Sequence, residues 1–386
     1  MNDKLNMRNR GDFINQSHRE GYKSTSSFLI NRSFEWQDKQ INIMLESCMH
    51  RLGELNAYCK HFKDIDTHLP MFTAIEVTAS NMMEGIRSNV TQAFLPSASK
   101  GYRSLIAHKQ VTNYISSIDW AVKELEKFPL SLHMVKETHR MLYADLPKEE
   151  ETAGKLRMKF NAKDNKHQGS SGSKYTPPSK HDLKVLINDA KWFWRNEDLE
   201  LPYLIKMAIS LCQFETILPF LDGNGRTART LILLELLSLK FIEKPIFCLS
   251  AFFEKNRLEY YHRLNLIRSK NDVEQWIRFF ITGMNETATF CIERLEELQA
   301  LKDSYLERVE AKLGKKRHPS AKQLLQIFYT KPYLSVNEIK EEMQLSFQSA
   351  NQLVKEFEEV GFIKEMAGAR RNRVFYLWEY LAIFEM

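Results

Sequence analysis

The stretch Leu218-Pro219-Phe220-Leu221-Asp222-Gly223-Asn224-Gly225-Arg226-Thr227-Ala228-Arg229 decides how the rest of the chain is interpreted. Two glycines flank Asn224, so successive backbone N–H groups can turn inward, and the helix expected to begin there adds its positive dipole end. Arg226 and Arg229 fall on the first helical turn, where two guanidinium groups can hold separate phosphates. Asp222 is placed to hold a magnesium ion on those phosphates. The stretch therefore predicts a site for a polyphosphate.

Two other interpretations fit these residues less well. Gly223-x-Gly225-x-x-Ala228 matches the dinucleotide-binding fingerprint, but that fingerprint requires a preceding strand inside a βαβ unit. Both flanks here have helical periodicity, and the chain has no G-x-x-x-x-G-K-[ST] loop. The plainer alternative is a helix-capping turn with solvated arginines. An acid, Gly-Asn-Gly and two arginines at these spacings make that alternative improbable.

The whole chain has the composition of a folded protein with substantial cores: 386 residues, 43% hydrophobic and 27% charged. Its apolar runs, such as Leu231–Leu239 broken by Glu235, fall short of the roughly 20 residues that cross a bilayer. The polar N-terminus lacks the apolar stretch of a signal peptide, so we expect a cytoplasmic protein with no membrane partner. The net charge of +6 permits nucleic-acid contact without demanding it.

The cysteines agree with a reducing compartment. They are five in number, far apart in sequence and never in a C-x-x-C pair, which argues against a disulfide framework or a zinc site. We expect all of them to be core residues: Cys48, Cys59, Cys212, Cys248 and Cys291.

Apolar residues recur at three- and four-residue intervals over most of residues 36–312, which predicts a mainly α fold. Residues 1–35 show no lasting periodicity and are expected to form an arm, either loose or laid over a partner surface. Residues 150–180 form a polar stretch rich in Gly and Ser, and loops of this length tend to be functional. Residues 313–319 concentrate charge, Gly and Pro between helical segments and are expected to be a linker.

Residues 320–386 have a different pattern. Gly361 ends a helix, and residues 362–381 are predicted to form a two-stranded hairpin that turns at residues 367–369. Three helices followed by a β-ribbon indicate a winged helix-turn-helix. The three helices are expected at Ala321–Phe328, Ser335–Met343 and Ser346–Val360.

The partner of this C-terminal module stays open between DNA, another protein and a second copy of the chain. Polar side chains at the start of the third helix could reach base edges, and arginines on the ribbon suit phosphates. Glu356, Glu358 and Glu359 on the same helix repel DNA. The candidate DNA-contacting residues are Gln348, Asn351, Gln352, Arg370, Arg371 and Arg373.

With Phe214-Glu215-Thr216-Ile217 ahead of it, the glycine motif closely resembles the signature H-P-F-x-[DE]-G-N-G-R-x-x-R of the Fic family. Residues 111–114, 129–131, 249–252 and 276–280 also resemble that family, so the resemblance covers roughly residues 70–300. It implies a Fic-type helical bundle with a small β-hairpin flap. It also implies transfer of AMP from Mg-ATP to a Ser, Thr or Tyr hydroxyl of a target protein.

The resemblance assigns roles to particular residues. The flap, which in the family holds the target as an added strand, corresponds to Ser173, Lys174, Tyr175 and Thr176. Asp222 and Arg226 correspond to catalytic residues. The nucleotide-binding residues implied are Gly223, Asn224, Gly225, Arg226, Thr227, Arg229, Tyr260 and Tyr261.

One departure from the family pattern bears on catalysis. The family's general base is the histidine that opens the motif, and this chain has Leu218 there. A general base typically contributes ~10²–10⁴-fold in rate, and leucine cannot accept a proton. The nearest histidines in sequence, His181 and His262, are tens of residues away. The chain is therefore expected to bind Mg-ATP and to be impaired in AMP transfer, with a non-enzymatic, nucleotide-responsive regulator as the alternative.

A second family motif lies upstream. Ser80, Glu84 and Gly85 fit the pattern [ST]-x-x-x-E-[GN], which self-inhibited Fic proteins carry on a helix, here expected at about residues 71–85. Taken alone, these residues favour an amphipathic helix that ends at Gly85 and leaves Glu84 solvated. The resemblance implies that Glu84 pairs with Arg229 and occupies the site of the γ-phosphate. It also divides the helical part into an inhibitory region, residues 36–105, and a Fic core, residues 106–312, followed by the winged helix, residues 320–386.

Overall fold

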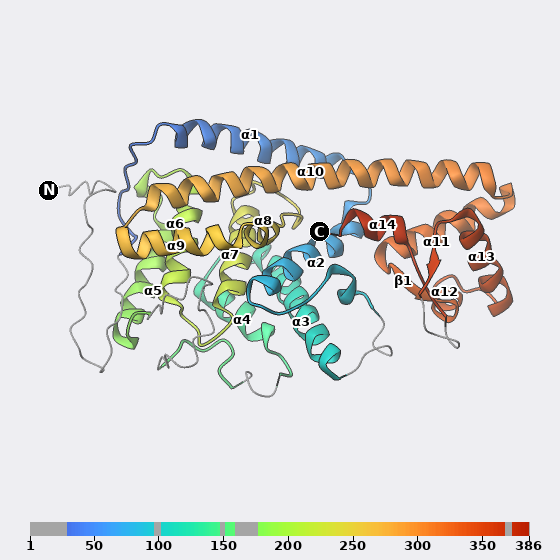
Figure 1. Ribbon diagram of the computed structural model, residues 1–386, viewed down its shortest axis with the longest axis horizontal. Coiled ribbons are helices and arrows are strands. Elements are labelled where there is room, and N and C mark those ends of the chain that lie inside the picture. The colour runs from blue at the N-terminus through green and yellow to red at the C-terminus, as the bar shows by residue number, and fades with distance from the viewer. Residues whose placement is uncertain (1–28, 96–101, 147–150, 159–176, 367–372, 386) are drawn as a thin grey trace.

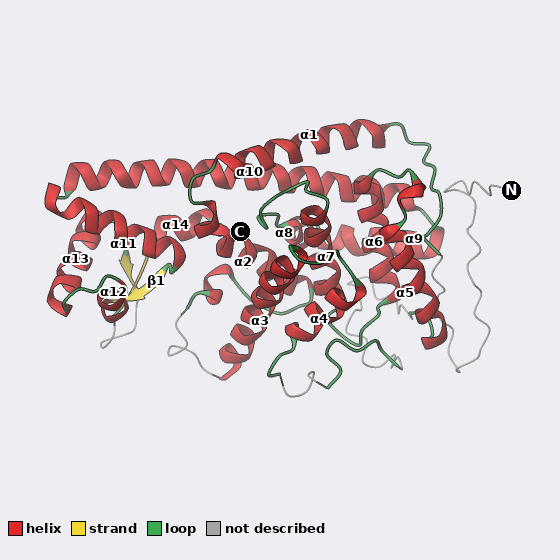
Figure 2. Cartoon of the chain, turned by 180° about the vertical axis from the view of Figure 1, so that it is seen from behind, coloured by secondary structure: helices red, strands yellow, loops and turns green. Residues whose placement is uncertain are grey.

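The protein is described by a computed structural model that covers residues 29–95, 102–146, 151–158, 177–366 and 373–385. Its fold is mainly α, as predicted, with one small three-stranded sheet (Figures 1 and 2). The helices are α1 (Gln40–His61), α2 (Ile65–Met83), α3 (Tyr102–Leu125), α4 (Leu132–Leu142), α5 (Lys180–Arg195), α6 (Tyr203–Ile217), α7 (Asn224–Ser238), α8 (Leu249–Lys255), α9 (Arg257–Lys270), α10 (Val273–Lys312), α11 (His318–Thr330), α12 (Val336–Glu342), α13 (Phe347–Val360) and α14 (Trp378–Ile383), with 3₁₀ turns η1 (Val90–Ala93), η3 (Glu197–Leu199) and η4 (Lys315–Arg317).

Helix α10 is the longest of the described helices and runs along the molecule. Its 40 residues make it about 60 Å long, and α1 runs beside it along one edge (Figure 1). The two helices meet because each carries an apolar stripe at helical spacing, which in α1 includes Ile41, Leu45 and Cys48. Near its C-terminal end, α10 buries Tyr305 edge-on against Phe362 of the C-terminal module. One helix thus connects the two ends of the fold.

The expected inhibitory helix is α2, which starts at Ile65 rather than near residue 71 and continues through Pro70. Every residue from Met71 to Asn81 is buried, so α2 is a core helix and not an amphipathic surface helix. Even its charged residue Glu76 is buried, where it accepts hydrogen bonds from the backbone N–H (2.9 Å) and the hydroxyl of Ser250. Burial raises the pKa of Glu76 to about 6.

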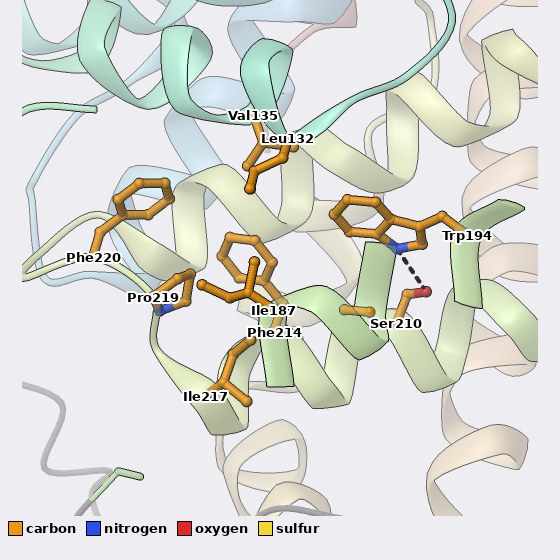
Figure 3. Close-up of a pocket in the computed structure, with 10 residues that line it drawn as sticks. Leu132, Val135, Ile187, Trp194, Ser210, Phe214, Ile217, Pro219 and Phe220 are labelled. Carbon is orange, nitrogen blue, oxygen red and sulfur yellow. Dashed lines mark hydrogen bonds between the residues drawn. The ribbon is translucent and has the colours of Figure 1, made fainter. Parts of the chain in front are cut away.

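Helices α4, α5 and α6 support residues 219–220 with an apolar wall (Figure 3). Leu132 and Val135 come from α4, Ile187 and Trp194 from α5, and Phe214 from α6. The space left between these side chains is about 20 Å³, room for a single water. This wall is therefore a packed support for the loop between α6 and α7 and leaves no room for a substrate.

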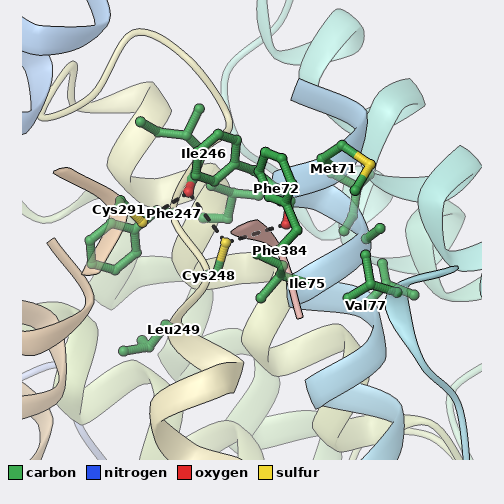
Figure 4. Close-up of a cluster of buried hydrophobic side chains, with 14 of the residues drawn as sticks. Met71, Phe72, Ile75, Val77, Ile246, Phe247, Cys248, Leu249, Cys291 and Phe384 are labelled. Atoms are coloured by element: carbon green, nitrogen blue, oxygen red, sulfur yellow. Dashed lines mark hydrogen bonds between the residues drawn. The ribbon is translucent and has the colours of Figure 1, made fainter. Parts of the chain in front are cut away.

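The N-terminal half of α2 packs on the C-terminal end of the chain (Figure 4). Phe72 meets the ring of Phe384 at 5.4 Å, and the Cys248 thiol donates to the Phe72 carbonyl. One turn earlier, His68 Nδ1 bonds the Tyr380 hydroxyl at 3.0 Å, and that hydroxyl also bonds the Tyr329 carbonyl. The helix that carries Glu84 at one end is thus fixed to the C-terminal module at the other.

The C-terminal module contains the three expected helices as α11, α12 and α13, which are slightly longer or shorter than predicted. Strands β2 (Lys364–Glu365) and β3 (Val374–Tyr376) pair antiparallel, as the predicted hairpin requires. A further strand, β1 (Tyr333–Ser335), pairs with β3 and gives the order β1-β3-β2. Three helices with paired strands are the elements of a winged helix-turn-helix, which stays a prediction for this module.

The prediction that the hairpin continues to residue 381 is wrong. After β3 the chain forms α14, because the residues that it must bury recur at helical spacing: Tyr380, Leu381, Ile383 and Phe384. The turn expected at residues 367–369 lies outside the described residues. The predicted linker also contains η4, and α11 begins at His318.

The structure also bears on the predictions for the cysteines and for the N-terminal arm. All five cysteines are free and buried, as predicted. Of the predicted arm, residues 29–35 are described. Ile30 is buried, its backbone N–H donates to the Asp189 carboxylate of α5, and Phe34 meets Phe193 edge-on. No helix in the described ranges is both long and apolar enough to cross a membrane.

We predict that Tyr380→Phe lowers the free energy of unfolding by about 1–3 kcal/mol, because it leaves the buried His68 Nδ1 without its partner. Urea denaturation followed by circular dichroism measures this change. Tyr376→Phe, at a half-buried tyrosine of β3, is the matched control. An equal, small effect of both substitutions would show that the bond between α2 and α14 contributes nothing.

Candidate functional site

The glycine motif forms the loop between α6 and α7. Asn224 holds the loop closed, since its side-chain oxygen accepts from the Phe220 N–H at 2.8 Å and its amide donates to the Phe220 carbonyl at 2.9 Å. The Thr227 hydroxyl likewise donates to the Gly223 carbonyl. Both side chains were predicted to bind nucleotide. In the structure both side chains shape the loop, and of the two residues only Asn224 has a backbone N–H that precedes the first helical hydrogen bond.

Leu218 is the C-cap of α6 and has a left-handed backbone, with φ of 42°. This conformation is costly for leucine, whereas histidine, asparagine and aspartate are several-fold enriched in it. Its side chain is buried, with 4% of its surface exposed. The backbone at position 218 thus suits the histidine of the family signature better than the leucine that is present.

Arg157 fixes this strained position, a role that no sequence pattern indicated. Its buried guanidinium donates to the carbonyls of Leu218 (2.7 Å), Ile217 (3.0 Å) and Pro178 (2.7 Å), and its backbone N–H donates to Pro219. A buried cation with several carbonyl acceptors holds them firmly. Arg157 therefore ties the end of the 150–180 stretch to the start of the motif.

The N-terminus of α7 is an anion cradle. Gly223 caps the helix with φ of 70°, and the first i→i−4 bond is the one that Thr227 N–H donates to Gly223, so the N–H groups of residues 224–226 precede it. A Cβ on Gly225 would come within 2.1 Å of a Glu84 carboxylate oxygen. The Glu84 carboxylate thus lies against the backbone at Gly225, and it would have to shift if a Cβ were present there.

Arg226 is buried within the site. Its Nη2 donates to the Tyr143 hydroxyl at 2.8 Å, and its guanidinium lies 5.1 Å from the Tyr143 ring centre. Its Nε and Nη1 are buried without a hydrogen-bond partner among the described residues. Buried donors without partners are rare and costly, so these two atoms indicate a missing acceptor such as a phosphate oxygen.

Arg229 joins α7 to the predicted inhibitory residues. Its Nε donates to the Ser80 hydroxyl and its Nη2 to the Ser80 carbonyl, each at 2.9 Å. Nη2 also pairs with a Glu84 oxygen at 2.8 Å. Burial alone would lower the pKa of Arg229, but nearby carboxylates, chiefly Glu84, raise it above its ordinary value. Glu84 is the C-cap of α2, and Gly85 follows with φ of 77°.

Glu215 is a second carboxylate near Arg229, at 3.8 Å from Nη1. No role was predicted for it from the sequence. Its oxygen accepts from the hydroxyl of the fully buried Tyr260 at 2.9 Å. The Tyr261 hydroxyl donates to the Met83 carbonyl at the end of α2. Both tyrosines thus border the site, and Tyr260 is a core residue there. A charged residue inside the apolar run of α6 was the sequence signal for Glu215.

Asp222 is exposed at the mouth of the cradle, and one carboxylate oxygen accepts from the Gly223 N–H at 2.8 Å. Within the described ranges no three acidic, histidine or cysteine side chains come together to hold a metal. Asp222 would therefore bind magnesium only together with phosphate oxygens, which is the usual mode for that ion.

His139 of α4 lies beside the motif. The histidines nearest to the motif in sequence, His181 and His262, are both exposed. The His139 ring stacks on Phe220 with centres 3.8 Å apart. The Gly154 N–H donates to Nδ1 at 2.8 Å, so Nε2 carries the proton and donates to the Asp222 carbonyl at 2.8 Å. Burial lowers the pKa of His139 to about 4. With both nitrogens bonded to backbone, His139 cannot act as the missing base.

The remaining predicted residues belong to the flap and to the C-terminal module. The flap residues 173–176 and the ribbon residues Arg370 and Arg371 fall outside the described residues. Gln348 and Gln352 are exposed on α13 and Asn351 is partly buried between them. Arg373 pairs with Glu365 across the ribbon at 3.2 Å. The structure therefore brings the motif together with Ser80 and Glu84, and the described C-terminal candidates lie on α13 and beside β3.

Residues 129–236, which span α4 to α7, match the Fic/DOC family. Three solved structures are similar in fold. A Fic family protein from Desulfovibrio desulfuricans G20 has a TM-score of 0.53 at 15% identity and covers 92% of this chain and 98% of its own. Fic-1 (residues 134–508) from C. elegans has a TM-score of 0.51 at 21% identity, covering 69% and 74%. A Fic domain-containing signaling protein from Bacteroides thetaiotaomicron VPI-5482 has a TM-score of 0.50 at 17% identity, covering 64% and 98%.

We predict that His139 makes the fold sensitive to acid. Its pKa is lowered to about 4 in the folded chain and should be near 6.5 in the unfolded chain, so the unfolded state gains the proton first as the pH falls. Between about pH 7.5 and about pH 5 this costs about 2 kcal/mol of stability. His139→Phe, which keeps a ring on Phe220, should reduce the pH dependence by that amount in urea unfolding. An unchanged pH dependence in the variant would contradict the prediction.

Proposed function

From the Fic/DOC family domain in residues 129–236, we propose that the chain binds Mg-ATP at the N-terminus of α7 and is self-inhibited by Glu84. Fic domains generally transfer AMP to proteins, which supports a Ser, Thr or Tyr hydroxyl of a target protein as acceptor. Leu218 stands at the position of the general base, so we propose that this transfer is impaired. A target segment would bind at residues 173–176.

One observation carries the proposal: the Glu84 carboxylate lies in the anion cradle itself. It is 2.8 Å from Arg229 and close enough to Gly225 to exclude a Cβ there. A carboxylate and a phosphate seek the same donors, namely helix N-terminal N–H groups and a guanidinium. Glu84 is therefore a competitor for one phosphate of a bound nucleotide.

The residues present fit a nucleoside triphosphate and its magnesium ion. Arg226 offers two buried nitrogens without partners, and Arg229 offers a nitrogen that Glu84 now uses. Asp222 is exposed where it could share a magnesium ion with the phosphates. Magnesium bound there would neutralise phosphate charge and so assist departure of the pyrophosphate.

Impairment is supported by the surroundings of position 218. Leucine there cannot take the proton of an attacking hydroxyl, and the neighbouring histidine, His139, has both nitrogens engaged with backbone groups. Arg157 nevertheless holds the backbone at position 218 in the left-handed conformation that histidine tolerates. The scaffold is thus arranged for a base that the chain lacks.

A second candidate function is a nucleotide-responsive regulator that acts through the C-terminal module. It is favoured by Gln348 and Gln352, which are exposed four residues apart on one face of α13. Against it, Glu365 already neutralises Arg373. Duplex DNA binding that weakens as salt rises would favour this function over protein or self-association.

We predict that Glu84→Gln tightens Mg-ATP binding about 10-fold, because a charge-assisted competitor for Arg229 is removed. Isothermal titration calorimetry of the full chain measures the dissociation constants. The affinity for AMP, which lacks the outer phosphates, should rise less. Glu54→Gln, at an exposed ion pair of α1, is the control. Equal affinity of the variant and the unaltered chain for ATP would refute competition by Glu84.

We predict that restoring histidine at position 218 restores transfer. The double variant Glu84→Gly/Leu218→His should attach AMP to itself or to proteins of a cell extract ~10²–10⁴-fold faster than Glu84→Gly alone. Radiolabel from the α-phosphate of ATP reports the transfer, and Leu218→Met in the same background is the control. Equal labelling in all three proteins would mean that another group supplies the base.

A further inference from the structure

Arg229 is a buried cation that lies between two carboxylates of different origin. It is 2% exposed. Glu84 approaches Nη2 from the end of α2 at 2.8 Å, and Glu215 approaches Nη1 from α6 at 3.8 Å. A buried charge is tolerated only when an opposite charge or several hydrogen bonds compensate it.

Glu84 cannot be the sole counter-ion if it also yields to a phosphate. While Glu84 is displaced and before a phosphate arrives, Arg229 would keep only the two bonds to Ser80, which are to neutral oxygens. Removing one partner of a buried ion pair is strongly destabilising. A displaceable inhibitor therefore requires a second carboxylate that stays in place.

Glu215 is fixed in place by hydrogen bonds at its carboxylate and at its backbone carbonyl. Its oxygen accepts from the Tyr260 hydroxyl, and its backbone carbonyl accepts from Arg268 at 2.8 Å. Tyr260 is in turn fixed by ring contacts with Phe253 and Trp276. These partners belong to α8, α9 and α10, so none of them is carried by α2.

We propose that Glu215 is the permanent counter-ion and positioning residue of Arg229, and that it allows Glu84 to be exchanged for a phosphate. The charge compensation stands on the geometry alone, whereas the exchange rests on the proposed function. Glu215 is not a ligand for the nucleotide, because its carboxylate repels phosphate. Its longer distance from Arg229 leaves the guanidinium free to make its closer bonds to the exchanging anion.

The test is a double-mutant cycle in the full-length chain with Glu84→Gln and Glu215→Gln, which remove charge and keep shape. Each single variant leaves one carboxylate on Arg229 and should lower the melting temperature little. The double variant leaves no carboxylate ion-paired with Arg229, and only the more distant Glu76 of α2 still acts on it. Its loss should exceed the sum of the single losses by about 3 °C or more. Mg-ATP should raise the melting temperature of the double variant more than that of Glu84→Gln, because phosphate then supplies the missing charge.

The control is Glu235→Gln, at a buried carboxyl of α7 that faces Lys206, whose loss should add to that of Glu84→Gln. If the double variant does not fold, Glu84→Gln/Tyr260→Phe tests the same coupling through the hydroxyl that fixes Glu215. Additive losses in these cycles would overturn the proposal. Coupled losses with no effect of Mg-ATP on any variant would support the counter-ion and refute the nucleotide site.

Discussion

The buried guanidinium of Arg229 is the constraint on which the site depends. Three helices must come together to compensate one charge: α7 carries Arg229, α2 supplies Ser80 and Glu84, and α6 supplies Glu215. A buried cation without these partners would cost several kcal/mol, a large part of a typical folding free energy. The same charge that would attract a phosphate thus fixes the packing of the core around it.

Helix α2 joins this site to the rest of the molecule. Its C-terminal end carries Glu84, while its N-terminal half packs on Tyr380 and Phe384 at the end of the chain. Glu76 in its middle caps the backbone of Ser250. Because α2 is buried along most of its length, Glu84 is held in the anion cradle at the C-cap of a core helix. A displaced Glu84 therefore has to leave by the last turn of α2, at Gly85.

At position 218 the backbone geometry is independent of the side chain. The left-handed backbone, the Arg157 bonds and the apolar wall behind Pro219 and Phe220 are all in place. None of these features depends on the side chain at position 218, because they act on its backbone and on its neighbours. Binding and base catalysis are thus physically separable here, which is why the proposed function divides them.

Local sequence determined much of this protein. Helical periodicity gave the mainly α class, Gly223 and Gly225 gave the helix start and the cradle, and the spacing of Arg226 and Arg229 placed two cations on one turn. The pairing of Glu84 with Arg229 also followed from a motif, although the two residues are 145 positions apart. Short-range rules of turns and helix faces suffice for the helices, the turn and the two cations, whereas the Glu84–Arg229 pair was implied only by the family resemblance.

Tertiary structure alone decided the rest, because it depends on which surfaces meet. Arg157 and His139 act on the motif through backbone carbonyls and N–H groups, which leave no mark in a sequence pattern. Asn224 and Thr227 turned inward to bond the loop. The segment after Tyr376 carries apolar residues at helical spacing, but the face that they pack on, from α2 and α10, exists only in the folded chain. Glu215 gained its role only when folding placed it beside a buried charge, since compensation depends on distance in space and not in sequence.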